Sequence, residues 1–326
     1  MEPKNSSESN SELKKSFVFI LNDINVEGEL PIEVAPGHFF QKADNEQIKM
    51  IKERLPHFMP YIPTPLPYEG KIVKIPKGKQ GSFSLNYEPL DEKYWKYHII
   101  TFEGVNKELQ DIEYAASLLE HDLELGFSFL SSTKYDGFAF SWHQLSLTSF
   151  FSDKAFIEPA VTIADDEIQQ IFDNYALIKK IDSEHEHVTR ALRKFDHLNS
   201  LPRNSELIII GLFSIIESLV THSPKLTESA DSLMHQIKTK IALLSKRFPR
   251  KLEYIKYFGE IREENLWKKL YEYRSQIVHG EHSGLTGSLQ VLKNIKTVQE
   301  FLRETTKLLL LLALQETTLL KDLKKC

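Results

Sequence analysis

The chain has 326 residues, 41% of them apolar and 27% charged, with a formal net charge of −5 at pH 7. This composition excludes a disordered chain and allows two cores of ordinary domain size. The single cysteine, Cys326, excludes a disulfide framework or a thiolate metal site within one chain, so we expect a reducing, cytoplasmic location.

Residues 1–15 are polar and lack the apolar segment of a signal peptide, so we expect a flexible tail. The longest apolar run, residues 308–314, is far shorter than the roughly 20 residues that cross a bilayer. We expect a buried helix there and no membrane association.

Residues 16–163 contain short apolar runs broken by Pro, Gly, Asn and Asp, which is the pattern of strands. The runs are SFVFILN, KIVKIP, GSFSLNY, YWKYHIITF, LGFSFL and GFAFSW. Several alternate with period two, which favours a sandwich or a partly open barrel. Two helices are expected within this part, at residues 44–55 and 106–120.

Residues 164–326 show helical periodicity instead, so the whole chain is expected to be α+β, with an all-α bundle after the strand-rich domain. The expected helices span residues 164–197, 206–220, 229–245, 252–258, 263–279 and 289–323. The second is apolar on nearly every side, as in a helix surrounded by others.

The two halves carry different charge. Residues 1–160 hold 16 Lys and Arg against 24 Asp and Glu, whereas residues 161–326 hold 25 against 22. The basic residues gather between 238 and 274, where they could attract phosphates or lie on solvated helix faces. The candidate RNA-binding residues are Lys246, Arg247, Arg250, Lys268 and Lys269.

The most informative segment is YRSQIVHG, which ends the helix expected at 263–279. It places Arg274 and His279 with four residues between them, and Gly280 follows where a helix would stop. Chance alone produces about one Arg-x4-6-His match in a chain of this composition, and a second match occurs at Arg190 and His197.

The segment resembles the Arg-x4-6-His motif of HEPN domains, and in particular the ApeA-like HEPN group. Ser275 and the Ile-Val pair stand at the family's places, and Ile-Glu-Ser-Leu at Ile216 to Leu219 is also similar to the family. The resemblance covers residues 164–326, and the segment QKADNEQIKMIKERL adds a generic likeness in the first half.

The resemblance implies a homodimeric, metal-independent endoribonuclease that cleaves host RNA such as tRNA in antiviral defence by abortive infection. It also implies that the first half senses a phage-derived or protein trigger, or regulates the helical half. The alternative is a non-catalytic HEPN dimer that binds a nucleotide or a partner protein.

RNA cleavage needs a base for the 2′-OH proton, an acid for the departing 5′-oxygen, and a cation for the charged phosphorane. Histidine suits the first two tasks because imidazole gains and loses a proton near neutral pH. Arginine suits the third because its planar fork matches phosphate oxygens. We therefore expect Arg274 and His279 to be catalytic, with no metal and no cofactor.

Helix geometry predicts that a single chain does not complete the catalytic site. Five positions on a helix separate Arg274 and His279 by about 140°. We expect a core stripe and, beside it, a stripe that faces a second subunit in an isologous dimer. The core stripe is Leu266, Leu270, Tyr273 and Ile277, and the second stripe is Trp267, Tyr271, Arg274 and Val278.

Glu217 lies within the apolar helix at 206–220 and has two interpretations. It could pair with Arg274 and orient the guanidinium, with Ser275 as a second supporting residue, or it could form a solvated edge with Ser214 and Thr221. The histidines at 185, 187 and 197 match no known metal-ligand spacing, which favours a solvated polar face.

Overall fold

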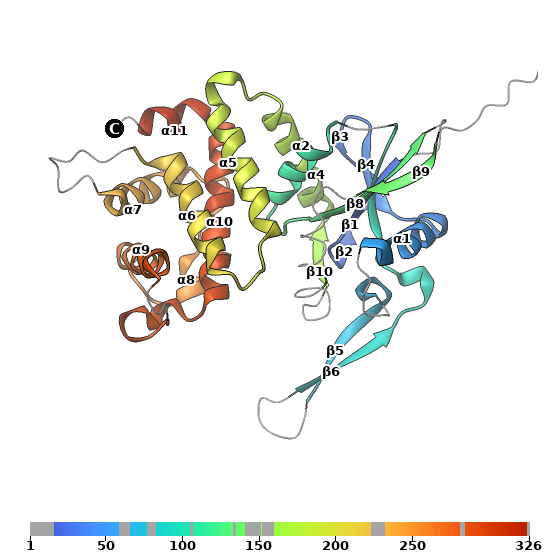
Figure 1. The fold of residues 1–326 in the computed structure, drawn as a ribbon, viewed down its shortest axis with the longest axis horizontal. Helices are drawn as coiled ribbons and strands as arrows, with labels where there is room; N and C mark the ends of the chain where they lie inside the picture. Colours follow the sequence, from blue (N-terminus) through green and yellow to red (C-terminus); the bar gives the residue numbers. More distant parts are fainter. Residues whose placement is uncertain are drawn as a thin grey trace, which may run out of the picture.

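The computed structural model describes residues 16–58, 66–76, 83–104, 107–132, 135–140, 151, 160–222, 232–280 and 284–324. The predicted tail at 1–15 and Cys326 lie outside these ranges. The α+β class is confirmed, with a sheet in the first half and helices in the second (Figure 1).

Six strands form one antiparallel sheet in the order β3-β4-β7-β1-β8-β9. The central strand β1 is buried along its whole length. The strands are β1 (Ser16–Ile20), β3 (Ile32–Ala35), β4 (His38–Lys42), β7 (His98–Phe102), β8 (Leu125–Ser132) and β9 (Tyr135–Phe140).

Two further strand pairs lie outside this sheet. The antiparallel ribbon of β5 (Gly70–Pro76) and β6 (Phe83–Pro89) projects downward from the sheet half in Figure 1. Strand β2 (Ile24–Glu27) pairs in parallel with β10 (Val161–Ala164), the last strand before the helices. Residues far apart in sequence therefore meet beside the main sheet.

Helices, not a second sheet, cover both faces of the six-stranded sheet. Phe17 and Phe19 of β1 pack with helix α1 (Asn45–Phe58). Val18 and Ile20 belong to the other core, which includes α2 (Leu109–Ser117). The expected sandwich or barrel is therefore corrected: successive side chains of β1 point to opposite faces of the sheet, and both sets are buried under helices.

The second half is a helical bundle around α6 (Glu206–Val220), which contacts α5, α7, α9 and α10. The long helix expected at 164–197 is two helices, because Asp182 accepts hydrogen bonds from the backbone N–H of Glu184 and His185 and starts a new turn. The helices are α4 (Asp165–Ile178), α5 (Glu186–His197), α7 (Leu233–Leu244), α8 (Tyr254–Phe258), α9 (Glu263–His279), α10 (Ile295–Gln315) and α11 (Thr317–Leu323).

Short 3-10 turns connect these elements at Pro67–Glu69, Glu92–Tyr94, Ser183–His185, Leu198–Ser200, Ser245–Arg247 and Gly287–Leu292. Across the described ranges, no helix combines the length and apolar character needed to span a bilayer.

One hydrophobic core crosses the predicted domain boundary at 163 and 164. Helix α4 packs against β3 and α2, and the core that contains Val18 of β1 also contains Leu309 of α10. Figure 1 shows α2 and α4 between the sheet and the other helices. The boundary stays a prediction, but the two parts share buried surface.

Lys307 of α10 adds a polar connection between the halves. Its Nζ donates to the carbonyls of Leu119 (2.8 Å) and Glu120 (3.2 Å), just after α2. Its Nζ also lies 3.5 Å from a carboxylate oxygen of Asp122. Lys307 is only 5% exposed, so its ammonium group has little access to water.

Replacing Lys307 with Met should lower the free energy of unfolding by about 1–3 kcal/mol, because the buried carbonyl of Leu119 and the partly buried carbonyl of Glu120 lose their donor. Urea unfolding of the full chain measures this change. Lys194→Met, at an exposed position of α5, is the matched control and should change stability by less than about 0.5 kcal/mol. Equal stability of the two variants would contradict the structural role of Lys307.

Candidate active site on helices α6 and α9

The ends of helix α9 are fixed by its sequence. Glu263 and Glu264 occupy the first turn, where carboxylates interact favourably with the positive end of the helix dipole. Gly280 follows the last turn with φ 68° and ψ 21°, a left-handed conformation that glycine adopts without strain. His279 is therefore the last helical residue, as predicted.

One face of α9 packs into the bundle. Leu266, Leu270 and Tyr273 are buried as predicted, and Ile277 packs against the same core. The prediction for Trp267 is wrong. The sequence pattern places it on the subunit-facing stripe, but it is 1% exposed, and its ring centroid lies 5.7 Å from that of Phe301. Burial of this large aromatic side chain in the core removes more apolar surface from water than a position on the subunit-facing stripe would.

The rest of the second stripe is Tyr271, Arg274 and Val278. Val278 is 47% exposed, which is high for a branched apolar side chain. Arg274 lies over the Tyr271 ring, with 5.6 Å between the guanidinium carbon and the ring centroid. This cation–π contact limits where the guanidinium can point.

Arg274 also forms an ion pair with Glu217 of α6, which was one of the two interpretations of Glu217. Arg274 Nη2 lies 3.5 Å from Glu217 Oε1, and the side chains are 24% and 17% exposed. The solvated-edge interpretation is wrong, because Thr221 is buried and its hydroxyl donates to the Glu217 carbonyl. Ser214 is exposed.

The ion pair leaves hydrogen-bonding capacity unused. Neither Arg274 Nε nor Glu217 Oε1 has a hydrogen-bond partner among the described residues. Burial raises the pKa of Glu217, and the positive charge of Arg274 partly opposes this rise. The carboxylate therefore positions Arg274 from one side while other guanidinium donors remain available to a bound anion.

His279 is exposed at the end of α9 and makes no side-chain hydrogen bond or ion pair within the described part of the chain. On a regular helix it points about 140° away from Arg274. One chain therefore does not bring the two predicted catalytic residues to a common point. Ser275 is half-buried beside Arg274.

The predicted RNA-binding residues divide into two groups. Arg247 forms a bidentate pair with Glu316, and Arg250 forms one with Glu304. Lys269 pairs with Glu272 at 2.8 Å. Lys246 and Lys268 are exposed and form no ion pair within the described ranges. Acidic neighbours thus neutralise much of the local basic excess.

The histidines at 185, 187 and 197 do not form a metal site with other described residues. His185 Nδ1 lies 2.7 Å from Asp182, and its ring centroid is 6.2 Å from that of His187. Where residues are described, no group of three His, Cys, Asp or Glu side chains is placed to hold a metal ion. Arg190 and His197 of the second motif match are both exposed on α5.

A cavity in the sheet half was not predicted from the sequence. Lys42, Lys71, Lys96 and His98 line it from three separate segments. No local pattern connects these residues, because only the folded sheet brings them together.

Comparisons with protein-family models, with curated proteins and with solved structures found no match to this chain. The HEPN assignment therefore stays a prediction from the residues of α6 and α9.

A double-mutant cycle with Glu217→Gln and Arg274→Gln should give a coupling energy of about 1 kcal/mol, because the pair is partly shielded from water. Urea unfolding of the four proteins provides the measurement. The exposed pair Lys49 and Glu53, 4.0 Å apart, is the control cycle and should give a smaller value. Equal coupling in both cycles would show that Glu217 does not hold Arg274.

Proposed function

We propose that this protein is a metal-independent endoribonuclease of the HEPN type. The observation that carries the proposal is the placement of Arg274. Glu217 and Tyr271 hold its guanidinium, while His279 ends the same helix in an exposed position. This arrangement supplies an anchored cation and one accessible imidazole, two of the three groups that the reaction requires.

In the proposed reaction, a neutral imidazole removes the proton from a ribose 2′-OH, and the 2′-oxygen attacks the adjacent phosphorus. The bond from phosphorus to the 5′-oxygen breaks, and an imidazolium donates a proton to that leaving oxygen. The products are a 2′,3′-cyclic phosphate and a 5′-OH. Arg274 stabilises the extra negative charge on the phosphorane.

The base and the acid must be in opposite protonation states at the same time, so one His279 cannot perform both tasks in one step. A second copy of the chain would supply the other imidazole. It would also overcome the separation of about 140° between Arg274 and His279. We therefore propose an isologous homodimer in which the exposed edge of α9, including Val278, faces its counterpart.

The substrate we propose is host RNA such as tRNA, and the role is antiviral defence in the cytoplasm. The first half would sense a phage-derived or protein trigger. The shared core supports such regulation, because α4 packs against β3 and Lys307 of α10 donates to the Leu119 carbonyl.

Purified wild type incubated with total tRNA in EDTA should generate fragments with 2′,3′-cyclic phosphate ends. His279→Ala and Arg274→Ala should lower the cleavage rate by about 100-fold or more, because each removes a group that acts in the transition state. Gel analysis and end-group chemistry provide the measurement. Parallel reactions with Mg²⁺ test the metal independence.

The control for this assay is His197→Ala, an exposed histidine that also ends a helix and follows an arginine at motif spacing. It should retain wild-type cleavage. A variant of His279 that cleaves as fast as the His197 control would remove the proposed catalytic role.

Val278→Glu should weaken the dimer and reduce cleavage together, because it places two negative charges across the proposed symmetric interface. Analytical ultracentrifugation measures the dimer. Ile75→Glu is the control, since Ile75 is 44% exposed on the distant β5–β6 ribbon (Figure 1). Loss of the dimer in both variants, or in neither, would contradict the proposed interface.

The second candidate function is a non-catalytic HEPN dimer that binds a nucleotide or a partner protein. The neutralised basic residues favour it, because Arg247, Arg250 and Lys269 already have acidic partners. This candidate predicts that His279→Ala alters binding or assembly while wild type leaves RNA intact.

A further inference from the structure

A cavity of about 620 Å³ lies in the sheet half, outside the candidate active site. Its walls come from β2, the ends of β4 and β10, the start of β7, and the base of the β5–β6 ribbon. Small-molecule sites commonly have volumes of about 300–1,000 Å³. The cavity is therefore large enough for a metabolite.

The cavity is positively charged although its half of the chain is acidic. Three lysines line it against one aspartate. Lys96 Nζ lies 2.6 Å from Asp23 Oδ1, so this lysine is neutralised by its neighbour. Lys42 and Lys71 are exposed and form no ion pair with any described residue. Two positive charges thus remain for a ligand.

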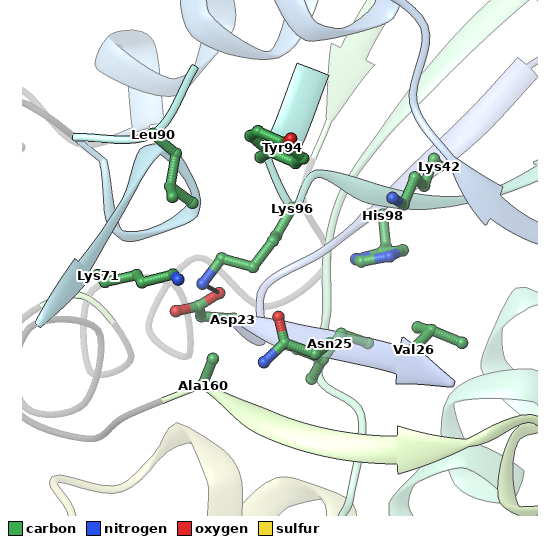
Figure 2. Close-up of a pocket in the computed structure, with 11 residues that line it drawn as sticks. Asp23, Asn25, Val26, Lys42, Lys71, Leu90, Tyr94, Lys96, His98 and Ala160 are labelled. Atoms are coloured by element: carbon green, nitrogen blue, oxygen red, sulfur yellow. Dashed lines mark ion pairs between the residues drawn. The ribbon is translucent and has the colours of Figure 1, made fainter. Parts of the chain in front are cut away.

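Figure 2 shows these charges at two ends of the cavity. Lys71 and Lys96 point toward Asp23 at one end, and Lys42 lies beside His98 at the other. A ligand that uses both free lysines must extend across the cavity. A chain of two or three phosphate groups provides several negative charges over such a span.

His98 provides an independent indication of a ligand. It is 1% exposed, and apart from a backbone contact with Lys96 its ring nitrogens have no hydrogen-bond partner among the described residues. Its ring stacks on Phe40, with centroids 5.4 Å apart, which fixes its orientation. Buried polar atoms without partners cost free energy, and a bound molecule could supply the missing hydrogen bonds.

The protonation state of His98 suits a hydrogen bond more than an ion pair. Burial lowers the pKa of His98 to about 4, and the charge of Lys42 acts in the same direction. At pH 7 the ring is neutral, so one nitrogen donates and the other accepts.

The remaining lining is apolar and aromatic. Val26 and Leu90 contribute aliphatic surface beside the buried Ile24, and Tyr94, which is 57% exposed, supplies an aromatic ring. Flat heterocycles stack on such rings. A base-sized ring and a phosphate chain would therefore each find matching chemistry in this cavity.

We propose that this cavity binds a nucleoside di- or triphosphate. Lys42 and Lys71 contact the phosphate chain, His98 forms a buried hydrogen bond with the ligand, and Tyr94 stacks on the base. The cavity includes Ile24 and Ala160, at the start of the β2–β10 pair that leads directly into α4. The bound ligand would therefore contact the junction between the two halves.

Isothermal titration calorimetry of the full chain tests this site, with ATP, GTP, ADP, pyrophosphate, inorganic phosphate and adenosine as probes, each with and without Mg²⁺. At least one nucleoside di- or triphosphate should bind, and more tightly than pyrophosphate or adenosine. Lys42→Gln combined with Lys71→Gln should weaken binding by about tenfold or more. Tyr94→Ala should remove the preference over pyrophosphate.

The matched control is Lys180→Gln combined with Lys194→Gln, which removes the same charge from exposed positions on the helical half. It should bind like wild type. The proposal is overturned if none of the nucleotides binds, if both lysine pairs have equal effects, or if inorganic phosphate and pyrophosphate bind as tightly as nucleotides. These readouts do not depend on RNA cleavage.

Discussion

Burial of helix α6 on nearly every side is the constraint on which the helical half depends. Its side chains pack toward α5, α7, α9 and α10, and even Gly211 is closely covered, since a Cβ there would lie 2.4 Å from Leu198 Cδ2. Within this apolar surface Glu217 is partly buried, and α9 supplies Arg274 as its partner. The packing of α6 against α9 therefore determines where the proposed catalytic arginine points.

The same packing extends into the sheet half. Helix α10 contacts α6 on the apolar side and connects to the end of α2 through Lys307. The β2–β10 pair makes a second connection, and the proposed nucleotide cavity lies beside it. A change in the cavity could reach the bundle through α4, because α4 follows β10 directly and packs against β3.

Local sequence signals predicted the two helices of the candidate site well. The expected bounds 206–220 and 263–279 match α6 and α9, because Ser205 caps the first and Gly280 ends the second. Prediction failed where distant residues decide the structure. The helix layers on the sheet, the burial of Trp267 and the lysine cavity all arise from contacts between separate segments. Helix α1 also continues through Pro56 to Phe58, beyond the expected end at residue 55.

The most direct test of the central claim is the specific RNA-cleaving activity of wild type in EDTA, measured against protein concentration alongside the dimer fraction from sedimentation. If two copies of α9 complete the site, specific activity will rise in proportion to the dimer fraction, and His279→Ala will remain inactive throughout. Equal specific activity in monomer and dimer, or a dimer that leaves RNA intact, would contradict the account.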